Sequence, residues 1–153
     1  MNYLKQVGVA LFMALIGITA NAGTWGEGPF DNDDAQDWLA ECSRSATPAV
    51  ISQAIESALK PGPVDATEGS IAIAAAEVVA AAHGKGIDAL NAQVAPCLAK
   101  KPTTEIRALA PQARKVVARV ADPNSSELAQ LWAEGKPNRW ALGLTRLAAR
   151  LQP

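Results

Sequence analysis

Apolar residues recur with the period of an α-helix along most of this chain, in segments separated by proline, glycine and asparagine. The first segment begins at Asp31 or Asn32, either of which can cap a helix, and ends at about Ser43. The second follows Thr47-Pro48, a favourable helix start, and continues to Lys60 ahead of a Pro-Gly-Pro stop. Both patterns predict amphipathic helices that each bury one face.

The third segment, about residues 67–82, is apolar on nearly every face, so it predicts a buried central helix. Its many alanines allow neighbouring helices to approach closely. Gly84 and Gly86 end it, and we expect a short helix around Asp88 to Val94, before Pro96.

Three more helical patterns complete the chain. Residues 103–121 keep the helical period, and Pro111 predicts a kink or a break near residue 110. Residues 124–127 resemble a capping box for the next helix. The last helix starts from Asn138; its apolar stripe is Trp140, Leu144, Leu147 and Leu151, and its arginines, expected to point away, are Arg139, Arg146 and Arg150. No segment alternates as a strand does, so the prediction is an all-α single domain of about six or seven helices over residues 23–153.

Residues 1–22 have the pattern of a secretory signal peptide. Lys5 precedes an apolar run from Val7 to Thr19, and Ala20-Asn21-Ala22 is a small-x-small cleavage pattern. A retained anchor helix is the alternative, although the run is shorter than the roughly 20 residues that span a bilayer. We therefore expect a cleaved signal and a periplasmic or secreted domain with no stable membrane association.

The charge and the cysteines of the remaining chain narrow the picture. Without Lys5, 13 basic residues face 15 acidic ones, a balance that predicts no nucleic-acid partner. Cys42 and Cys97 predict a disulfide in an oxidising compartment. A reactive thiol pair would need the Cys-x-x-Cys spacing, and one histidine is too few for a zinc site, so no metal or cofactor is expected.

The stretch from Gly23 to Trp38 combines glycines, a proline, two tryptophans and acids directly before a predicted helix. One interpretation is an anion site made by loop N–H groups and the helix dipole, with glycines at positive φ. The other, which we favour, is a structural clasp, because acids in the first turn already complement the dipole. A calcium loop lacks its glycine and its final glutamate. The candidate residues are Trp25, Gly26, Gly28, Phe30, Asp31, Asp33, Asp34 and Trp38.

Glu77 is the one charged residue within the apolar run, and burying its carboxylate unpaired would be costly. It is therefore either a general acid or base, or a latch that accepts hydrogen bonds from the N-terminal loop; we favour the latch. Glu127 and Glu134 flank Trp132 and could join Glu77 in an acidic pocket. Trp132 and Trp140 are expected in the core rather than on a ligand platform. His83, at the end of the same run, suits a helix C-terminus better than catalysis.

The chain resembles the domain of unknown function family 4259. The resemblance rests on Gly23-Thr24-Trp25-Gly26-x-Gly28-Pro29-Phe30-Asp31-Asn32-Asp33-x-Ala35-x-Asp37-Trp38, on Ala75-Ala76-Glu77-Val78-Val79-Ala80-Ala81 and on Ser126-Glu127-Leu128-x-x-Leu131-Trp132-x-Glu134. It implies a small helical domain and brings no established activity or catalytic residues. The export signal and the two cysteines suggest an exported variant of the family.

Three hypotheses on function follow. With no recognisable catalytic constellation, we favour a non-enzymatic protein that binds another protein, such as an immunity or inhibitor protein against a toxin or hydrolase. The alternative is a small-ligand-binding protein, or a hydrolase-type enzyme, with an acidic pocket around Glu77 and Glu127. A structural role in the cell envelope is the third.

Overall fold

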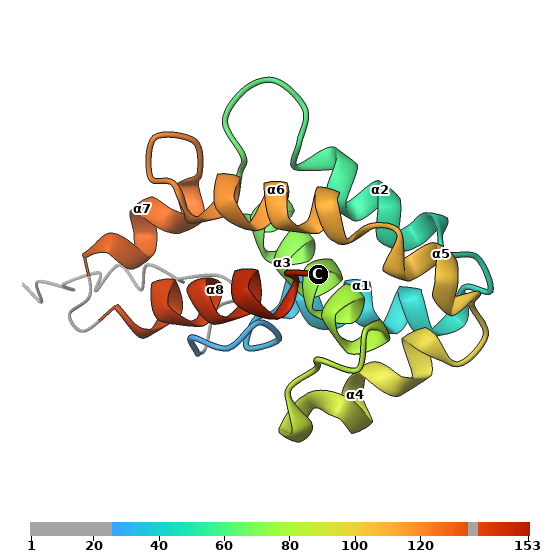
Figure 1. Cartoon of the computed structure of the whole chain (residues 1–153). Helices are drawn as coiled ribbons and strands as arrows, with labels where there is room; N and C mark the ends of the chain where they lie inside the picture. The colour runs from blue at the N-terminus through green and yellow to red at the C-terminus, as the bar shows by residue number, and fades with distance from the viewer. Residues whose placement is uncertain (1–25, 135–137) are drawn as a thin grey trace, which may run out of the picture.

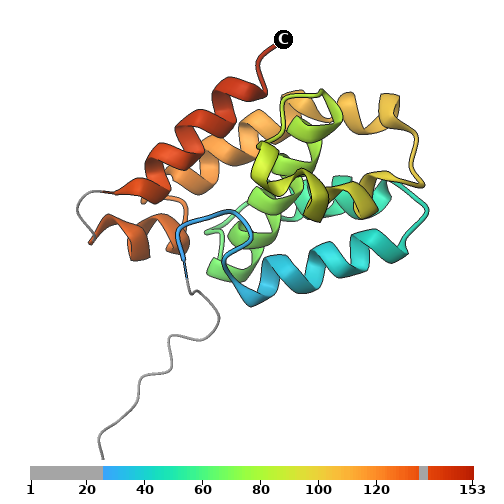
Figure 2. The same ribbon diagram turned by 90° about the horizontal axis from the view of Figure 1, so that it is seen from below.

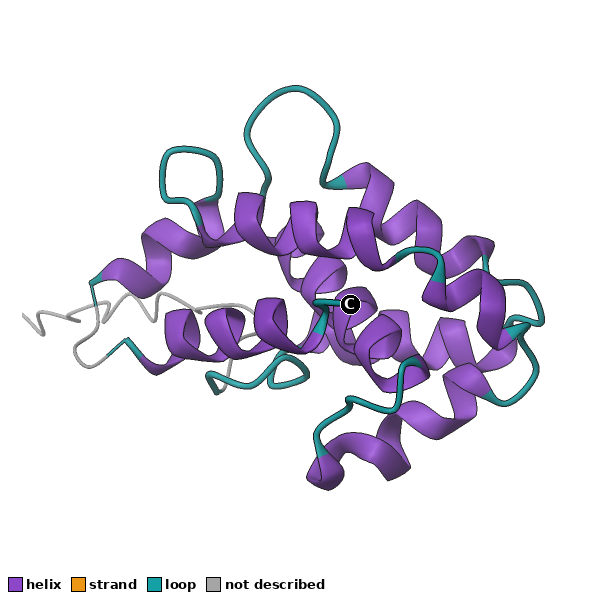
Figure 3. Ribbon diagram, in the orientation of Figure 1, coloured by secondary structure: helices purple, strands orange, loops and turns teal. Residues whose placement is uncertain are grey.

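The computed structural model describes residues 26–134 and 138–153, and these residues form eight α-helices and no strand (Figures 1 and 3). The predicted all-α fold is confirmed. The helices are α1 (Asp33–Arg44), α2 (Ala49–Ser57), α3 (Ala66–Ala82), α4 (Asp88–Leu98), α5 (Thr103–Arg107), α6 (Ala110–Ala121), α7 (Glu127–Ala133) and α8 (Arg139–Arg150). The number exceeds the six or seven expected because the segment around Pro111 is two helices, with the proline in the first turn of α6.

Helix α3 lies at the centre and packs against each of the other seven helices (Figures 1 and 2). Twelve of its 17 residues are buried, as its nearly continuous apolar sequence predicts. Small side chains such as Ala72, Ala74 and Ala76 are completely enclosed, so neighbouring helices approach it closely on every side. A charged group on the buried part of α3 must therefore find its partner inside the fold.

Polar side chains fix several helix starts. Asn32, rather than Asp31, caps α1, because its Oδ1 accepts from the Ala35 N–H at 2.8 Å. Ser126 caps α7 and Asn138 caps α8 in the same way. The expectation for α4 was wrong, since the helix continues through Pro96 to Leu98; the proline ring is exposed, and Val94 and Cys97 anchor this last turn in the core.

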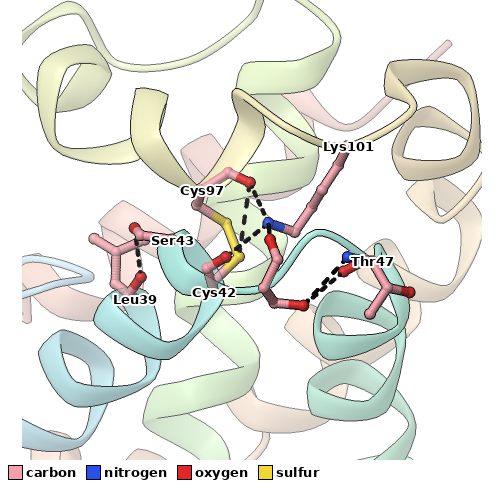
Figure 4. The surroundings of a disulfide bond; sticks show 7 residues. Leu39, Cys42, Ser43, Thr47, Cys97 and Lys101 are labelled. Carbon is pink, nitrogen blue, oxygen red and sulfur yellow. Dashed lines mark hydrogen bonds between the residues drawn. A yellow bond between two sulfur atoms is a disulfide. The ribbon is translucent and has the colours of Figure 1, made fainter.

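A disulfide joins Cys42 of α1 to Cys97 of α4, with the two Cα atoms 5.0 Å apart, and so the predicted pairing is confirmed. Lys101 lies beside it, and its buried ammonium donates to the carbonyl oxygens of Cys42 (2.6 Å), Ser45 (2.8 Å) and Cys97 (2.6 Å) (Figure 4). Burial lowers the pKa of Lys101, and the neighbouring Lys100 adds charge repulsion. Together the disulfide and Lys101 hold the C-terminal ends of α1 and α4.

No helix in the described ranges is long and apolar enough to span a membrane.

Candidate functional site

A cavity of about 550 Å³ lies between the N-terminal loop, α3 and α8. The loop (residues 26–32) runs beside α8 in Figures 1 and 2. Most of the wall is apolar, and four charged side chains reach the cavity. Its lining residues are Glu27, Gly28, Pro29, Ile73, Glu77, Ile87, Trp140, Gly143, Leu144, Arg146, Ala149 and Arg150. The space is concave, largely apolar and charged at a few points, as small-molecule sites usually are.

Glu77 forms a bidentate ion pair with Arg150 at this cavity. Arg150 Nη2 donates to Glu77 Oε1 at 2.7 Å, and Nη1 donates to Oε2 at 2.8 Å. Nη1 also donates to the Lys85 carbonyl oxygen at 3.2 Å. Arg150 therefore does not point away from the core as expected; it neutralises the carboxylate that is buried on α3.

The latch predicted between Glu77 and the loop backbone is not seen among the described residues. Both carboxylate oxygens of Glu77 are taken by Arg150, and no hydrogen bond joins Glu77 to residues 26–30. Glu77 and the loop instead line the same cavity, since Gly28 and Pro29 are also in its wall. The clasp residue Trp25 lies outside the described residues.

Arg146 is the second cation of the cavity. It is exposed at the rim, one turn before Arg150, and within the described part of the chain it has neither a hydrogen-bond partner nor an ion-pair partner. Arg150 keeps its Nε–H and one Nη2–H outside the contacts with Glu77 and Lys85. Glu77 neutralises Arg150. The charged groups that remain for a ligand are therefore those of Arg146 and the exposed Glu27.

The loop is held by Asp31. The Gly28 N–H donates to Asp31 Oδ2 at 2.9 Å, and the Asp31 N–H donates to the Gly28 carbonyl oxygen at 3.1 Å. A Cβ atom would lie 2.5 Å from Asp31 Oδ2 at Gly26 and 2.6 Å from it at Gly28. Neither glycine has a positive φ. Glycine is thus required here by the close approach of the carboxylate, and the positive φ expected at these positions was wrong.

The other residues of the predicted clasp belong to the start of α1 and to the core. Phe30 is buried, and its carbonyl oxygen accepts from Gln36 Nε2 at 2.9 Å. Trp38 is buried on the inner face of α1. Asp34 accepts from Thr67 Oγ1 at 3.1 Å, which ties α1 to α3, and Asp33 is exposed in the first turn of α1.

Glu127 does not share the cavity with Glu77. Its Oε2 accepts from the Ala66 N–H at 3.3 Å, at the start of α3. Glu77 is 11 residues further along that helix, about 16 Å at 1.5 Å per residue, and Glu134, also exposed, is not in the lining either. The structure therefore does not assemble the expected acidic pocket.

The two tryptophans of the C-terminal hairpin stack with ring centroids 6.3 Å apart. Trp140 is buried and also forms part of the cavity wall, while Trp132 is partly buried against the core. His83 is outside the cavity, and its Nε2 lies 3.1 Å from the Arg107 carbonyl oxygen. The described residues contain no cluster of acids, cysteines and histidine that could hold a metal ion.

Most of the cavity lining was not predicted from the sequence, including three residues of α8, namely Gly143, Arg146 and Arg150. Their spacing of three and then four residues places them on one face of α8. That spacing was visible in the sequence, but only the packing of α8 on α3 shows that this face adjoins Glu77.

The family described as "Domain of unknown function (DUF4259)" matches residues 23–141. The chain belongs to this family. The match to DUF4259 includes the loop (residues 26–32), α3 and the start of α8. It ends before Gly143, Arg146 and Arg150. No curated protein and no solved structure matches the chain significantly.

Proposed function

We propose that this domain binds a small amphipathic molecule with one acidic group in the cavity between the loop, α3 and α8. The observation that carries the proposal is the composition of that cavity. About 550 Å³ of mainly apolar space contains an arginine with no protein partner in the described residues. Volumes of about 300–1,000 Å³ are typical of small-molecule sites.

The two arginines of the site support an acid as the ligand, while Glu27 is the acid of the lining that Arg150 does not neutralise. Arg146 offers a whole guanidinium, and Arg150 offers the N–H groups that Glu77 and Lys85 leave. Two guanidinium groups one helical turn apart suit a carboxylate or another small anion. The apolar part of the ligand would contact Ile73, Ile87 and Leu144.

A hydrolase that uses Glu77 as a base is less well supported. A general base has to accept a proton from its substrate or water, and both oxygens of Glu77 already accept from Arg150. Glu127, the second candidate, instead accepts a hydrogen bond from the Ala66 N–H at the start of α3. The same geometry therefore favours binding over acid–base chemistry.

The immunity- or inhibitor-like role, with a toxin or hydrolase as partner, stays a prediction from the sequence; no contact in the described residues favours it. A periplasmic or secreted location is part of our proposal. The Cys42–Cys97 disulfide supports it, because disulfides persist in oxidising compartments.

Isothermal titration with three ten-carbon probes tests the proposal. Decanoate should bind, decanol should bind at least fivefold more weakly, and decyltrimethylammonium should not bind. Arg146→Gln should weaken decanoate at least fivefold. Arg139→Gln is the matched control, because Arg139 is exposed on α8 and outside the cavity lining. Equal affinities for the acid and the alcohol, or no binding of any probe, would contradict the proposal.

A further inference from the structure

Gly143 is the fifth of the twelve residues of α8, an unfavourable place for glycine. Glycine is the poorest helix former apart from proline, because ordering its backbone is entropically costly. A glycine kept inside a helix therefore needs a reason in the structure.

The described residues supply no such reason. A Cβ atom built at Gly143 has none of their heavy atoms within 4 Å, and Gly143 does not have a positive φ. Gly69 in α3 is different, because its Cβ would be 3.5 Å from both Leu128 and Val120. Packing explains a small residue at 69 but not at 143.

The cavity does offer a reason. Gly143 is part of its lining, on the same face of α8 as Arg146 and Arg150. It lies seven residues before Arg150, about 10 Å along the helix. The space that a side chain would occupy at 143 is thus next to the cavity, at a distance from the charged end that a small molecule can span.

We infer that Gly143 determines ligand specificity by admitting a planar ring against the backbone of α8. This inference rests on the proposed function and narrows its ligand to an aryl-substituted carboxylic acid. The acid group binds at Arg146 and Arg150, and the ring lies at Gly143 and Leu144. A linear alkyl chain can bend around one added side chain, whereas a rigid ring cannot. The missing side chain of Gly143 therefore matters for a ligand with a ring and hardly for a linear one.

Titration of two acids against three proteins tests this inference. The probes are 4-(2-naphthyl)butanoate and decanoate, and the proteins are the unmodified chain, Gly143→Leu and Thr145→Leu. Gly143→Leu should weaken the naphthyl acid at least tenfold and decanoate less than threefold. Thr145→Leu is the control for an added leucine on α8, since Thr145 is exposed and outside the lining; it should change neither affinity.

The outcomes separate the two proposals. If neither acid binds the unmodified chain, the proposed function is wrong. If both acids bind and Gly143→Leu weakens them equally, or weakens neither, the role of Gly143 in ring selection is wrong while acid binding stands. Gly143→Ala is a check on a folding defect in Gly143→Leu, because it should unfold at a higher temperature than the unmodified chain. It should weaken binding of the naphthyl acid, by a smaller factor than Gly143→Leu does.

Discussion

Arg150 donates to both carboxylate oxygens of Glu77 and thereby joins α8 to the centre of α3 across 73 positions of the chain. The Glu77 side chain is 6% exposed and that of Arg150 is 21% exposed. This asymmetry decides how the pair behaves: the carboxylate depends on the arginine, while the arginine retains access to water and to the cavity. One contact therefore stabilises the core helix and forms the charged end of the candidate site.

The asymmetry predicts unequal effects of breaking the pair. Arg150→Met leaves the Glu77 carboxylate buried without a partner and should lower the free energy of unfolding by about 3 kcal/mol. Glu77→Leu should cost less, because Arg150 can turn towards water. The double variant, Glu77→Leu with Arg150→Met, should lose less stability than the two single losses add up to. In urea unfolding at pH 7, we expect a difference of at least about 1 kcal/mol.

Arg146→Met is the matched control for these Glu77 and Arg150 variants, because Arg146 is on the same face of α8 and has no ion-pair partner in the described residues. It should change the free energy of unfolding by less than about 0.5 kcal/mol. Strictly additive losses in the Glu77 and Arg150 variants would show that the two side chains do not stabilise one another.

The loop makes a second prediction, about Gly28. In Gly28→Ala the new Cβ would lie 2.6 Å from Asp31 Oδ2, so the carboxylate must move and lose the Gly28 N–H. We expect a loss of about 1–2 kcal/mol in thermal unfolding, close to the contribution of a partly buried hydrogen bond to a charged group.

Asp31→Ala provides the test of that mechanism. It removes the atom that the new Cβ would meet, so Gly28→Ala should cost less in an Asp31→Ala background than alone. An equal cost in both backgrounds would mean that backbone conformation, rather than the contact with Asp31, requires glycine at position 28.

Most of the fold could be predicted because it depends on local chemistry. The continuous apolar sequence of α3 identified the central helix, and caps such as Asn32 and Ser126 identified helix starts. The disulfide followed from two cysteines and the inferred compartment. The end of α4 could not be predicted, because burial of Cys97 and Val94 outweighs the local effect of Pro96.

The site was harder to predict because it depends on which helix faces meet. The sequence identified Glu77 as unusual, but not that α8 supplies its partner. By its helical period, Arg150 belongs to the polar face of α8, which is expected to be exposed. Its contact with Glu77 arises only because α8 packs on α3. Glu127 was grouped with Glu77 by residue type, although Glu127 contacts the first residue of α3 and Glu77 lies 11 residues further along that helix.

Asp122 gives a prediction about pH. Its carboxylate accepts from the Asn124 backbone N–H at 2.9 Å, and from the side chains of Asn124 and Ser125. The backbone hydrogen bond above all holds the pKa of Asp122 below its ordinary value of 3.8. The folded state therefore binds this proton less readily than the unfolded state, and Asp122 stabilises the fold above about pH 4.

The difference in unfolding free energy between the unmodified chain and Asp122→Ala should thus be constant from pH 7 to about pH 5. It should shrink as the pH falls through 3.8 towards the folded pKa. Chemical unfolding of both proteins at pH 7, 5, 4 and 3 measures it. A difference that grows on acidification would have the opposite sign and would contradict the assignment.

The last prediction concerns the two links between α1 and α4. Lys101→Met leaves the carbonyl oxygens of Cys42, Ser45 and Cys97 without their ammonium donor and should cost about 2–4 kcal/mol. Lys100→Met is the control, because Lys100 is exposed and should cost less than about 0.5 kcal/mol.

Replacing Cys42 and Cys97 together by alanine opens a crosslink with a sequence separation of 55 residues, which in the chain-entropy model costs about 4 kcal/mol. Both links hold the same pair of helix ends. Lys101 follows α4 directly, so removing the disulfide should let α4 and Lys101 move away from α1 and deprive the lysine of its partners Cys42 and Ser45. The triple variant should therefore lose at least about 0.5 kcal/mol less than the sum of the two separate losses in urea unfolding. Additive losses would instead mean that Lys101 keeps its three carbonyl partners when the disulfide is absent, and that the lysine alone fixes the geometry of α1 and α4.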